Sequence, residues 1–114
     1  MPTLRVVLPD GQLPFHLGTL HEYNLWRNEV AKAFSYAPRG EFFPYLEGAW
    51  VEKSGPLISL LELPDENGRL LHWGCEKLLD EFQEYGRLLP VCSQSSVWKI
   101  ALKLAVFEYG DITI

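Results

Sequence analysis

The sequence has few of the residues that hold together small secreted or metal-binding domains. It contains two cysteines, Cys75 and Cys92, and three histidines in 114 residues. Two cysteines are too few for the disulfide scaffold of a small secreted domain. Structural zinc needs four ligands, usually in paired short spacings, and the chain offers no such pairs. We therefore expect reduced thiols, a cytoplasmic location, and no bound metal or other cofactor.

Long hydrophobic runs are also missing. The longest apolar stretch, Val97 to Phe107, is interrupted by Lys99 and Lys103. It is far shorter than the roughly 20 apolar residues that span a bilayer. No charged segment followed by an apolar one comes after Met1, so we expect no secretory signal and no membrane association.

Positive charge is scarce and scattered. Lys and Arg number 10 against 15 Asp and Glu, which gives a formal net charge of −5. Binding to duplex nucleic acid depends on neutralising phosphates with a basic stripe, and the chain has none. Glycine-rich loops that cradle phosphates are absent as well. We expect no direct binding to nucleic acid.

What the chain does have is enough apolar material for one core. Hydrophobic residues make up 47% of the chain, with 4 Trp, 5 Tyr and 6 Phe. A chain of this size buries about two-thirds of the surface that its unfolded form exposes. No internal repeat, linker or low-complexity tract divides it. The sequence therefore predicts a single compact domain over residues 1–114.

The first part of the chain predicts a hairpin. Leu4–Leu8 is a compact run containing two adjacent valines, and it ends at the turn sequence Pro9-Asp10-Gly11. Gln12–Leu17 can return antiparallel to it. Pro14 has no backbone N–H, so we expect this second strand to be short or to lie at a sheet edge.

A helix is predicted next. Thr19 and Glu22 have the spacing of a capping box, and Pro38 is expected to end the helix. The large apolar residues recur at helical spacing: Leu20, Tyr23, Trp26, Val30 and Phe34. Arg27 and Asn28 are expected to fall on the opposite, polar side.

Further strands are predicted after the helix. Ala49–Lys53 and Leu57–Leu63 are interpreted as a second hairpin across the turn Ser54-Gly55-Pro56. Pro64–Gly68 is a strong turn sequence, and Arg69–Trp73 is expected to return as another strand.

A second helix is predicted from an apolar stripe over Cys75–Tyr85, with Gly86 placed to end it. Val97–Tyr109 fits both a helix and a strand. Its apolar residues alternate more cleanly at period two, so the sequence predicts a strand, although its alanines and lysines suit a helix. The expected fold class is α+β, with an antiparallel or mixed sheet of about five to six strands and two helices on one face.

The chain carries no pattern that identifies catalytic residues. His72 and Cys75 lie close in sequence to Glu76 and Asp80, but no second ligand pair accompanies them. Cys75 falls on the apolar stripe of the predicted helix, where a thiol packs as a small hydrophobe. A small enzyme or a metal- or thiol-dependent module using His72 and Cys75 remains the alternative.

An aromatic segment is the feature that the predicted fold explains least. Between residues 36 and 50 the chain combines aromatic side chains with Pro, Gly, Arg and Glu. Tyr, Trp and Arg are enriched at interface hot spots, although aromatic side chains also fill cores. The segment supplies eight candidate partner-binding residues: Tyr36, Arg39, Glu41, Phe42, Phe43, Tyr45, Glu47 and Trp50.

The sequence therefore predicts a small acidic protein that binds another protein and acts by steric occupation. Inhibitors, antitoxins, immunity proteins and anti-defence proteins of phages, such as anti-CRISPR proteins, are classes of this kind. The acidic residues favour a partner with a basic surface. A further alternative is a structural adaptor that oligomerises through Val97–Tyr109 at a sheet edge.

Overall fold

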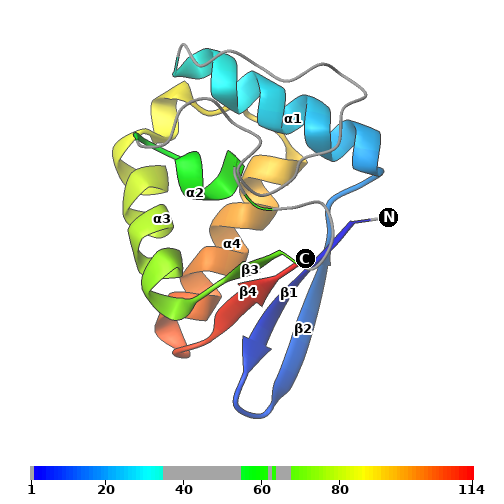
Figure 1. The fold of residues 1–114 in the computed structure, drawn as a ribbon, viewed down its shortest axis with the longest axis vertical. Coiled ribbons are helices and arrows are strands. Elements are labelled where there is room, and N and C mark those ends of the chain that lie inside the picture. Colours follow the sequence, from blue (N-terminus) through cyan, green and yellow to red (C-terminus); the bar gives the residue numbers. More distant parts are fainter. Residues whose placement is uncertain (1, 35–54, 62, 64–67) are drawn as a thin grey trace.

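The structure is a computed structural model that describes residues 2–34, 55–61, 63 and 68–114. Two predictions, the strand Ala49–Lys53 and most of the turn Pro64–Gly68, lie outside these residues. The described part of the chain forms a compact α+β fold (Figure 1). In order, its elements are β1 (Thr3–Leu8), β2 (Gly11–His16), α1 (Leu20–Ala33), α2 (Ile58–Leu61), β3 (Arg69–Leu70), α3 (His72–Glu84), the 3₁₀ helix η1 (Gly86–Leu88), α4 (Ser93–Phe107) and β4 (Asp111–Thr113).

The four strands form one antiparallel sheet in the order β2-β1-β4-β3. The predicted N-terminal hairpin is confirmed, because β1 and β2 pair from Thr3 with His16 to Leu8 with Gly11. Pro14 lies in β2, which is an edge strand, as its missing N–H requires. The last strand, β4, inserts between β1 and β3 and joins the two ends of the chain (Figure 1).

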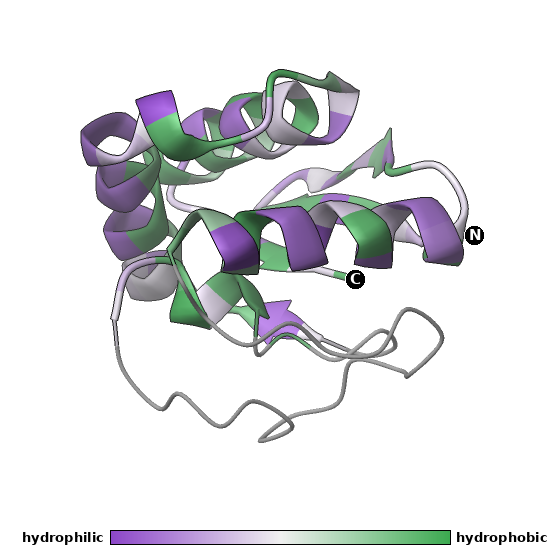
Figure 2. Ribbon diagram, turned by 90° about the horizontal axis from the view of Figure 1, so that it is seen from above, coloured by the Kyte–Doolittle hydropathy of each residue, from purple (hydrophilic) through white to green (hydrophobic). Residues whose placement is uncertain are grey.

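The sheet has one buried face. Val6, Ile112 and Leu70 form a cross-strand row in β1, β4 and β3, and all three are buried. Helices α3 and α4 pack against each other and against the sheet. Trp98 of α4, the largest fully buried side chain among the described residues, lies in the same core. Figure 2 shows the helical ribbons divided between hydrophobic and hydrophilic stretches, as amphipathic helices require.

Helix α1 begins where the sequence predicts. The Thr19 hydroxyl accepts from the Glu22 backbone N–H at 3.1 Å, and the Glu22 carboxylate accepts from the Thr19 N–H at 3.0 Å. These hydrogen bonds hold the pKa of Glu22 below its usual value. The helix ends at Ala33, before the predicted stop at Pro38.

The predicted polar side of α1 is wrong for two residues, because Arg27 and Asn28 are buried. The Arg27 guanidinium donates to the Leu63 carbonyl at 2.6 Å and to Asn24 Oδ1 at 2.9 Å. It also lies 4.4 Å from the centre of the Tyr23 ring. Helix α1 is therefore covered on more than its apolar stripe, since Arg27 binds the Leu63 backbone.

The predicted strand Leu57–Leu63 is also wrong. Its centre forms the short helix α2, and Leu61 N–H donates to the Leu57 carbonyl at 3.2 Å. Leu57 has a φ of 61°, and its N–H donates to Glu81 Oε2 of α3 at 3.2 Å. A short run that is apolar on both faces is compatible with a buried strand or a buried helix, and here the tertiary contacts selected the helix.

The longest predicted strand, Val97–Tyr109, is helical instead, as most of it belongs to α4. Its buried residues follow a helical period: Trp98, Ala101, Leu102 and Ala105. Ile100, which shares a strand face with Trp98, is 56% exposed. The two small alanines let α4 pack closely on its neighbours. The edge-strand route to oligomerisation is lost with the strand.

Helix α3 confirms the second predicted helix but begins earlier. The predicted strand Arg69–Trp73 contracts to Arg69–Leu70, since His72 and Trp73 form the first turn of α3. These changes replace the predicted five to six strands and two helices by four strands and four α-helices among the described residues. None of these helices is long and apolar enough to cross a membrane.

Candidate functional site

The predicted partner-binding segment lies outside the described residues, so its eight candidate residues remain predictions: Tyr36, Arg39, Glu41, Phe42, Phe43, Tyr45, Glu47 and Trp50. Within the described residues, the most chemically distinctive place is the end of the molecule where α3 begins and α4 ends (Figure 1).

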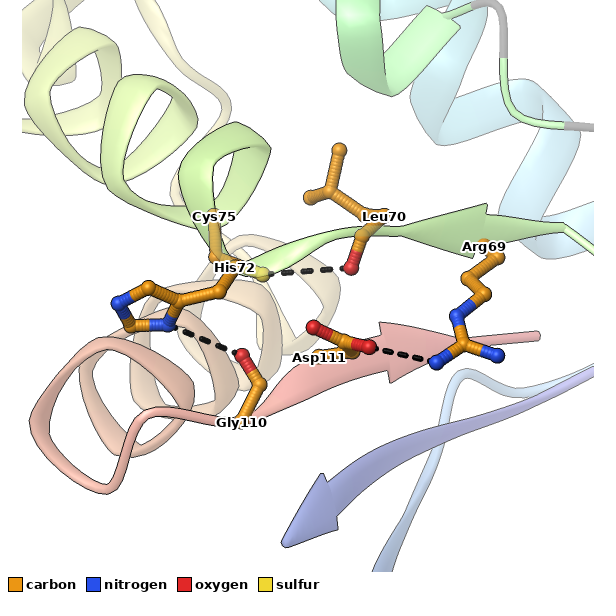
Figure 3. Close-up of polar contacts among 6 residues, drawn as sticks. All are labelled: Arg69, Leu70, His72, Cys75, Gly110 and Asp111. Carbon is orange, nitrogen blue, oxygen red and sulfur yellow. Dashed lines mark hydrogen bonds and ion pairs between the residues drawn. The ribbon is translucent and has the colours of Figure 1, made fainter.

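His72 fastens these two helices together. Its Nδ1 lies 3.1 Å from the carbonyl oxygen of Gly110, and its Nε2 lies 3.2 Å from Glu76 Oε1 (Figure 3). A carbonyl oxygen can only accept, so Nδ1 carries a proton in this contact. The imidazole also packs on the Tyr109 ring, with 5.4 Å between the ring centres. His72 thus positions the first turn of α3 against the loop that follows α4.

Cys75 points into the core from the same turn of α3. Its side chain is buried, and its Sγ donates to the Leu70 carbonyl oxygen at 3.6 Å (Figure 3). Burial, with a further contribution from the Asp111 charge, raises the pKa of the Cys75 thiol to about 12. The thiolate is the nucleophilic and metal-binding form, so these surroundings favour packing as the role of Cys75.

The sequence left open a metal-dependent module that uses His72 and Cys75. Over 2–34, 55–61, 63 and 68–114, no three His, Cys, Asp or Glu side chains are grouped closely enough to hold a metal ion. His72 is engaged with Gly110 and Glu76, and Cys75 faces the core. The two residues that the sequence placed together therefore point to different surroundings.

The C-terminus of α4 has an unusual residue at its turn. The Gly110 N–H donates to the Ala105 carbonyl at 2.7 Å, a bond from the second residue beyond the cap that is typical of a Schellman motif. The residue before it, Tyr109, has a φ of 57°. This left-handed position usually holds glycine, because a side chain there costs about 1 kcal/mol or more.

Glycine is instead fixed at the following position by a close approach. A Cβ on Gly110 would lie 2.5 Å from the Val7 carbonyl oxygen and 2.9 Å from Leu8 Cδ2. Gly110 therefore lets the chain pass tightly over β1 into β4. The turn needs a small residue at Gly110, whereas at Tyr109 the chain holds a large aromatic side chain in a disfavoured conformation.

Three strongly exposed aromatic side chains gather at this end of the molecule. Trp73 is 69% exposed, Phe107 80% and Tyr109 81%. Trp73 belongs to the first turn of α3, and Phe107 and Tyr109 lie at the end of α4. We call these three residues the aromatic end.

The charges around the aromatic end are of both signs, because the exposed Lys77 and Lys103 lie one helical turn from Trp73 and Phe107, respectively. Glu76 and Glu108 are exposed and neighbour it in sequence, and Asp80 follows on α3. The sequence pattern does not reveal this surface, because it predicts strands at Trp73 and Phe107. Trp73 falls opposite the apolar stripe of α3, a signal that becomes visible once the helix is known to start at His72.

No protein-family model, no curated protein and no solved structure matches this chain. Its function has to follow from its own side chains.

Proposed function

We propose that this chain is a protein-binding domain that acts by steric occupation of a partner, as inhibitors do, and that the aromatic end contacts that partner. The observation that carries the proposal is the concentration of Trp73, Phe107 and Tyr109 at one end of the fold, each more than two-thirds exposed. Isolated exposed apolar residues are ordinary on protein surfaces, but grouped Trp, Tyr and Phe are typical of interface anchors.

The backbone at Tyr109 adds a second reason. A left-handed non-glycine residue costs stability, and such strain persists mainly where the side chain has a use. In the isolated chain, Tyr109 contacts the His72 ring and is otherwise largely exposed to solvent. Burial of its ring by a partner would recover the apolar surface that the fold leaves exposed.

The exposed carboxylates and the net charge of the chain define the partner further. Glu76, Asp80 and Glu108 are exposed, and the chain carries a net charge of −5. A partner with an apolar pocket rimmed by Lys or Arg would complement this surface. Charge of this kind accelerates association and fixes orientation, so the association rate should fall as salt is added.

The experiment is an affinity capture from native lysate with four forms of the full chain. These are the unaltered protein, Trp73→Ala/Phe107→Ala, Phe43→Ala/Trp50→Ala, and the control Leu88→Ala/Val91→Ala. Leu88 and Val91 are also exposed apolar residues, but they lie in η1 and the segment that follows it. Far-ultraviolet circular dichroism checks that each form is folded.

A partner retained by the control and lost by Trp73→Ala/Phe107→Ala supports the aromatic end as the contact surface. If only Phe43→Ala/Trp50→Ala loses the partner, the binding function stands and the contact surface is the predicted segment at residues 36–50. Equal capture by all four forms would refute both surfaces, and no specific partner for any form would refute the binding function.

A further inference from the structure

The outer face of the sheet carries a row of hydrogen-bond donors. Arg5 of β1 and Arg69 of β3 both pair with Thr113, which lies between them in β4. The adjacent row, Val6, Ile112 and Leu70, faces the core. Side chains alternate between the faces of a strand, so the Arg5–Thr113–Arg69 row points to the opposite side. Figure 3 shows Arg69 and Leu70 directed to opposite sides of β3.

This row lines an open hollow of about 420 Å³. Six described residues, which lie in or next to all four strands, line it: Arg5, Gln12, Gly68, Arg69, Thr113 and Ile114. Their polar side chains offer two guanidinium groups, a hydroxyl and an amide, and none of the described residues that line the hollow is acidic. The two outer strands of the row are separated by two strand spacings, about 10 Å, which long arginine side chains can bridge.

The two arginines differ in how they are engaged. The Arg69 Nη2 donates to Asp111 Oδ2 at 2.7 Å, beside the hollow, and both side chains are partly exposed (Figure 3). Arg5, in contrast, has no hydrogen bond or ion pair within the part of the chain that the structure describes. Arg5 therefore has all its donors available, and Arg69 has those that Asp111 does not use.

We propose that this hollow binds a phosphate group, held by Arg5 and Arg69 from either side and by the Thr113 hydroxyl between them. A tetrahedral phosphate has oxygens for donors that converge from several directions. A flat carboxylate presents its two oxygens in one direction, to a single guanidinium, as Asp111 faces Arg69. The site lies on the outer face of the sheet, uses none of the three residues of the aromatic end, and does not depend on the protein-binding function.

The test is a titration of the ¹⁵N-labelled full chain with inorganic phosphate at pH 7.5 and constant ionic strength, followed by the amide resonances of Gly68, Arg69 and Thr113. Parallel titrations use glycerol phosphate and acetate. Arg5→Gln removes the unengaged guanidinium. Arg87→Gln, which changes an exposed arginine in η1, is the matched control. Asp111→Asn removes the competing carboxylate.

We expect saturable binding of phosphate with a Kd of about 1 mM or below, weakened about tenfold by Arg5→Gln and unchanged by Arg87→Gln. Asp111→Asn should tighten binding several-fold. Tighter binding of glycerol phosphate than of phosphate identifies a monoester as the ligand, and the reverse order identifies free phosphate. Shifts that do not saturate, equal losses in Arg5→Gln and Arg87→Gln, or acetate binding as tight as phosphate would each overturn the proposal.

Discussion

The amide nitrogen of Gly110 lies 2.7 Å from the carbonyl oxygen of Ala105, and this bond closes the last turn of α4 with Tyr109 held in the left-handed conformation. The Gly110 carbonyl oxygen also accepts a hydrogen bond from His72 Nδ1. One glycine therefore joins the end of α4, the start of α3 and the start of β4, and it fixes the position from which Tyr109 projects.

This geometry predicts opposite effects of two neighbouring substitutions. Tyr109→Gly removes the left-handed strain and should raise the free energy of unfolding by about 0.5–1 kcal/mol. Gly110→Ala places a Cβ 2.5 Å from the Val7 carbonyl oxygen and should lower it by about 2–3 kcal/mol. Urea unfolding of both variants measures the difference. A destabilised Tyr109→Gly variant would mean that the contact with His72 outweighs the strain. Under the proposed function, Tyr109→Gly should also bind its partner less well.

The helical form of residues 93–107 can be tested by charge insertion. Ile100 is exposed and Leu102 is fully buried, although a strand would place both on one face. Ile100→Lys should therefore change the free energy of unfolding by no more than about 0.5 kcal/mol. Leu102→Lys buries an unpaired charge and should cost more than about 4 kcal/mol, enough to unfold many domains. Thermal melts of the two variants separate these outcomes, and similar damage from both would contradict the helix.

The two thiols should differ strongly in reactivity. Cys92 is half-buried, and Cys75 is buried with its pKa raised to about 12. At pH 8 a group with this pKa is thiolate in about one molecule in ten thousand. N-ethylmaleimide should therefore label one thiol of the native protein quickly, and peptide mapping should locate it at Cys92. Cys75 should react only after urea unfolds the chain. Rapid native labelling of Cys75 would instead revive the thiol-dependent alternative.

We expect the charge of Glu81 to lower the free energy of unfolding at neutral pH, and this effect to disappear in acid. Desolvation raises the pKa of Glu81 in the folded state, against the opposing hydrogen bond from the Leu57 N–H. The charged carboxylate therefore disfavours folding above the folded-state pKa, and this penalty disappears as the pH falls towards the unfolded-state value. Glu81→Gln keeps an acceptor for Leu57 without the charge. It should be at least as stable as the unaltered protein at pH 7.5, with an advantage that shrinks on acidification.

The control for this comparison is Glu81→Leu, which removes the acceptor as well. Leaving the Leu57 N–H without its partner should cost about 1–3 kcal/mol at every pH. Guanidinium unfolding at several pH values between 4 and 8 provides both comparisons. An advantage of Glu81→Gln that grows as the pH falls would show that the carboxylate stabilises the fold.

The elements that the sequence determined are those built from contacts within a few residues. The turn at Pro9-Asp10-Gly11 and the capping box of Thr19 and Glu22 formed as predicted, because each depends on neighbours along the chain. The apolar stripe of α3 is buried from Cys75 to Phe82, as its helical period predicted, and only Tyr85 lies beyond the end of the helix. These features establish an α+β domain, but they do not establish how its surfaces are used.

Tertiary structure decided the segments whose local pattern fits two conformations. Val97–Tyr109 alternates like a strand, yet packing of Trp98, Ala101 and Leu102 against the sheet and α3 favours the helical period. The sequence pattern predicts Arg27 on the surface of α1. In the folded chain its guanidinium is buried and donates a hydrogen bond to the Leu63 carbonyl oxygen.

The candidate site follows the same rule. Its residues become neighbours only when His72 brings α3 to the end of α4, and the Arg5–Arg69 row exists only when β4 inserts between β1 and β3. The free energy of a helix cap or a turn depends on a few neighbouring residues, so a short stretch of sequence encodes it. Burial and exposure depend on distant segments, so the folded chain alone decides which side chains remain on its surface.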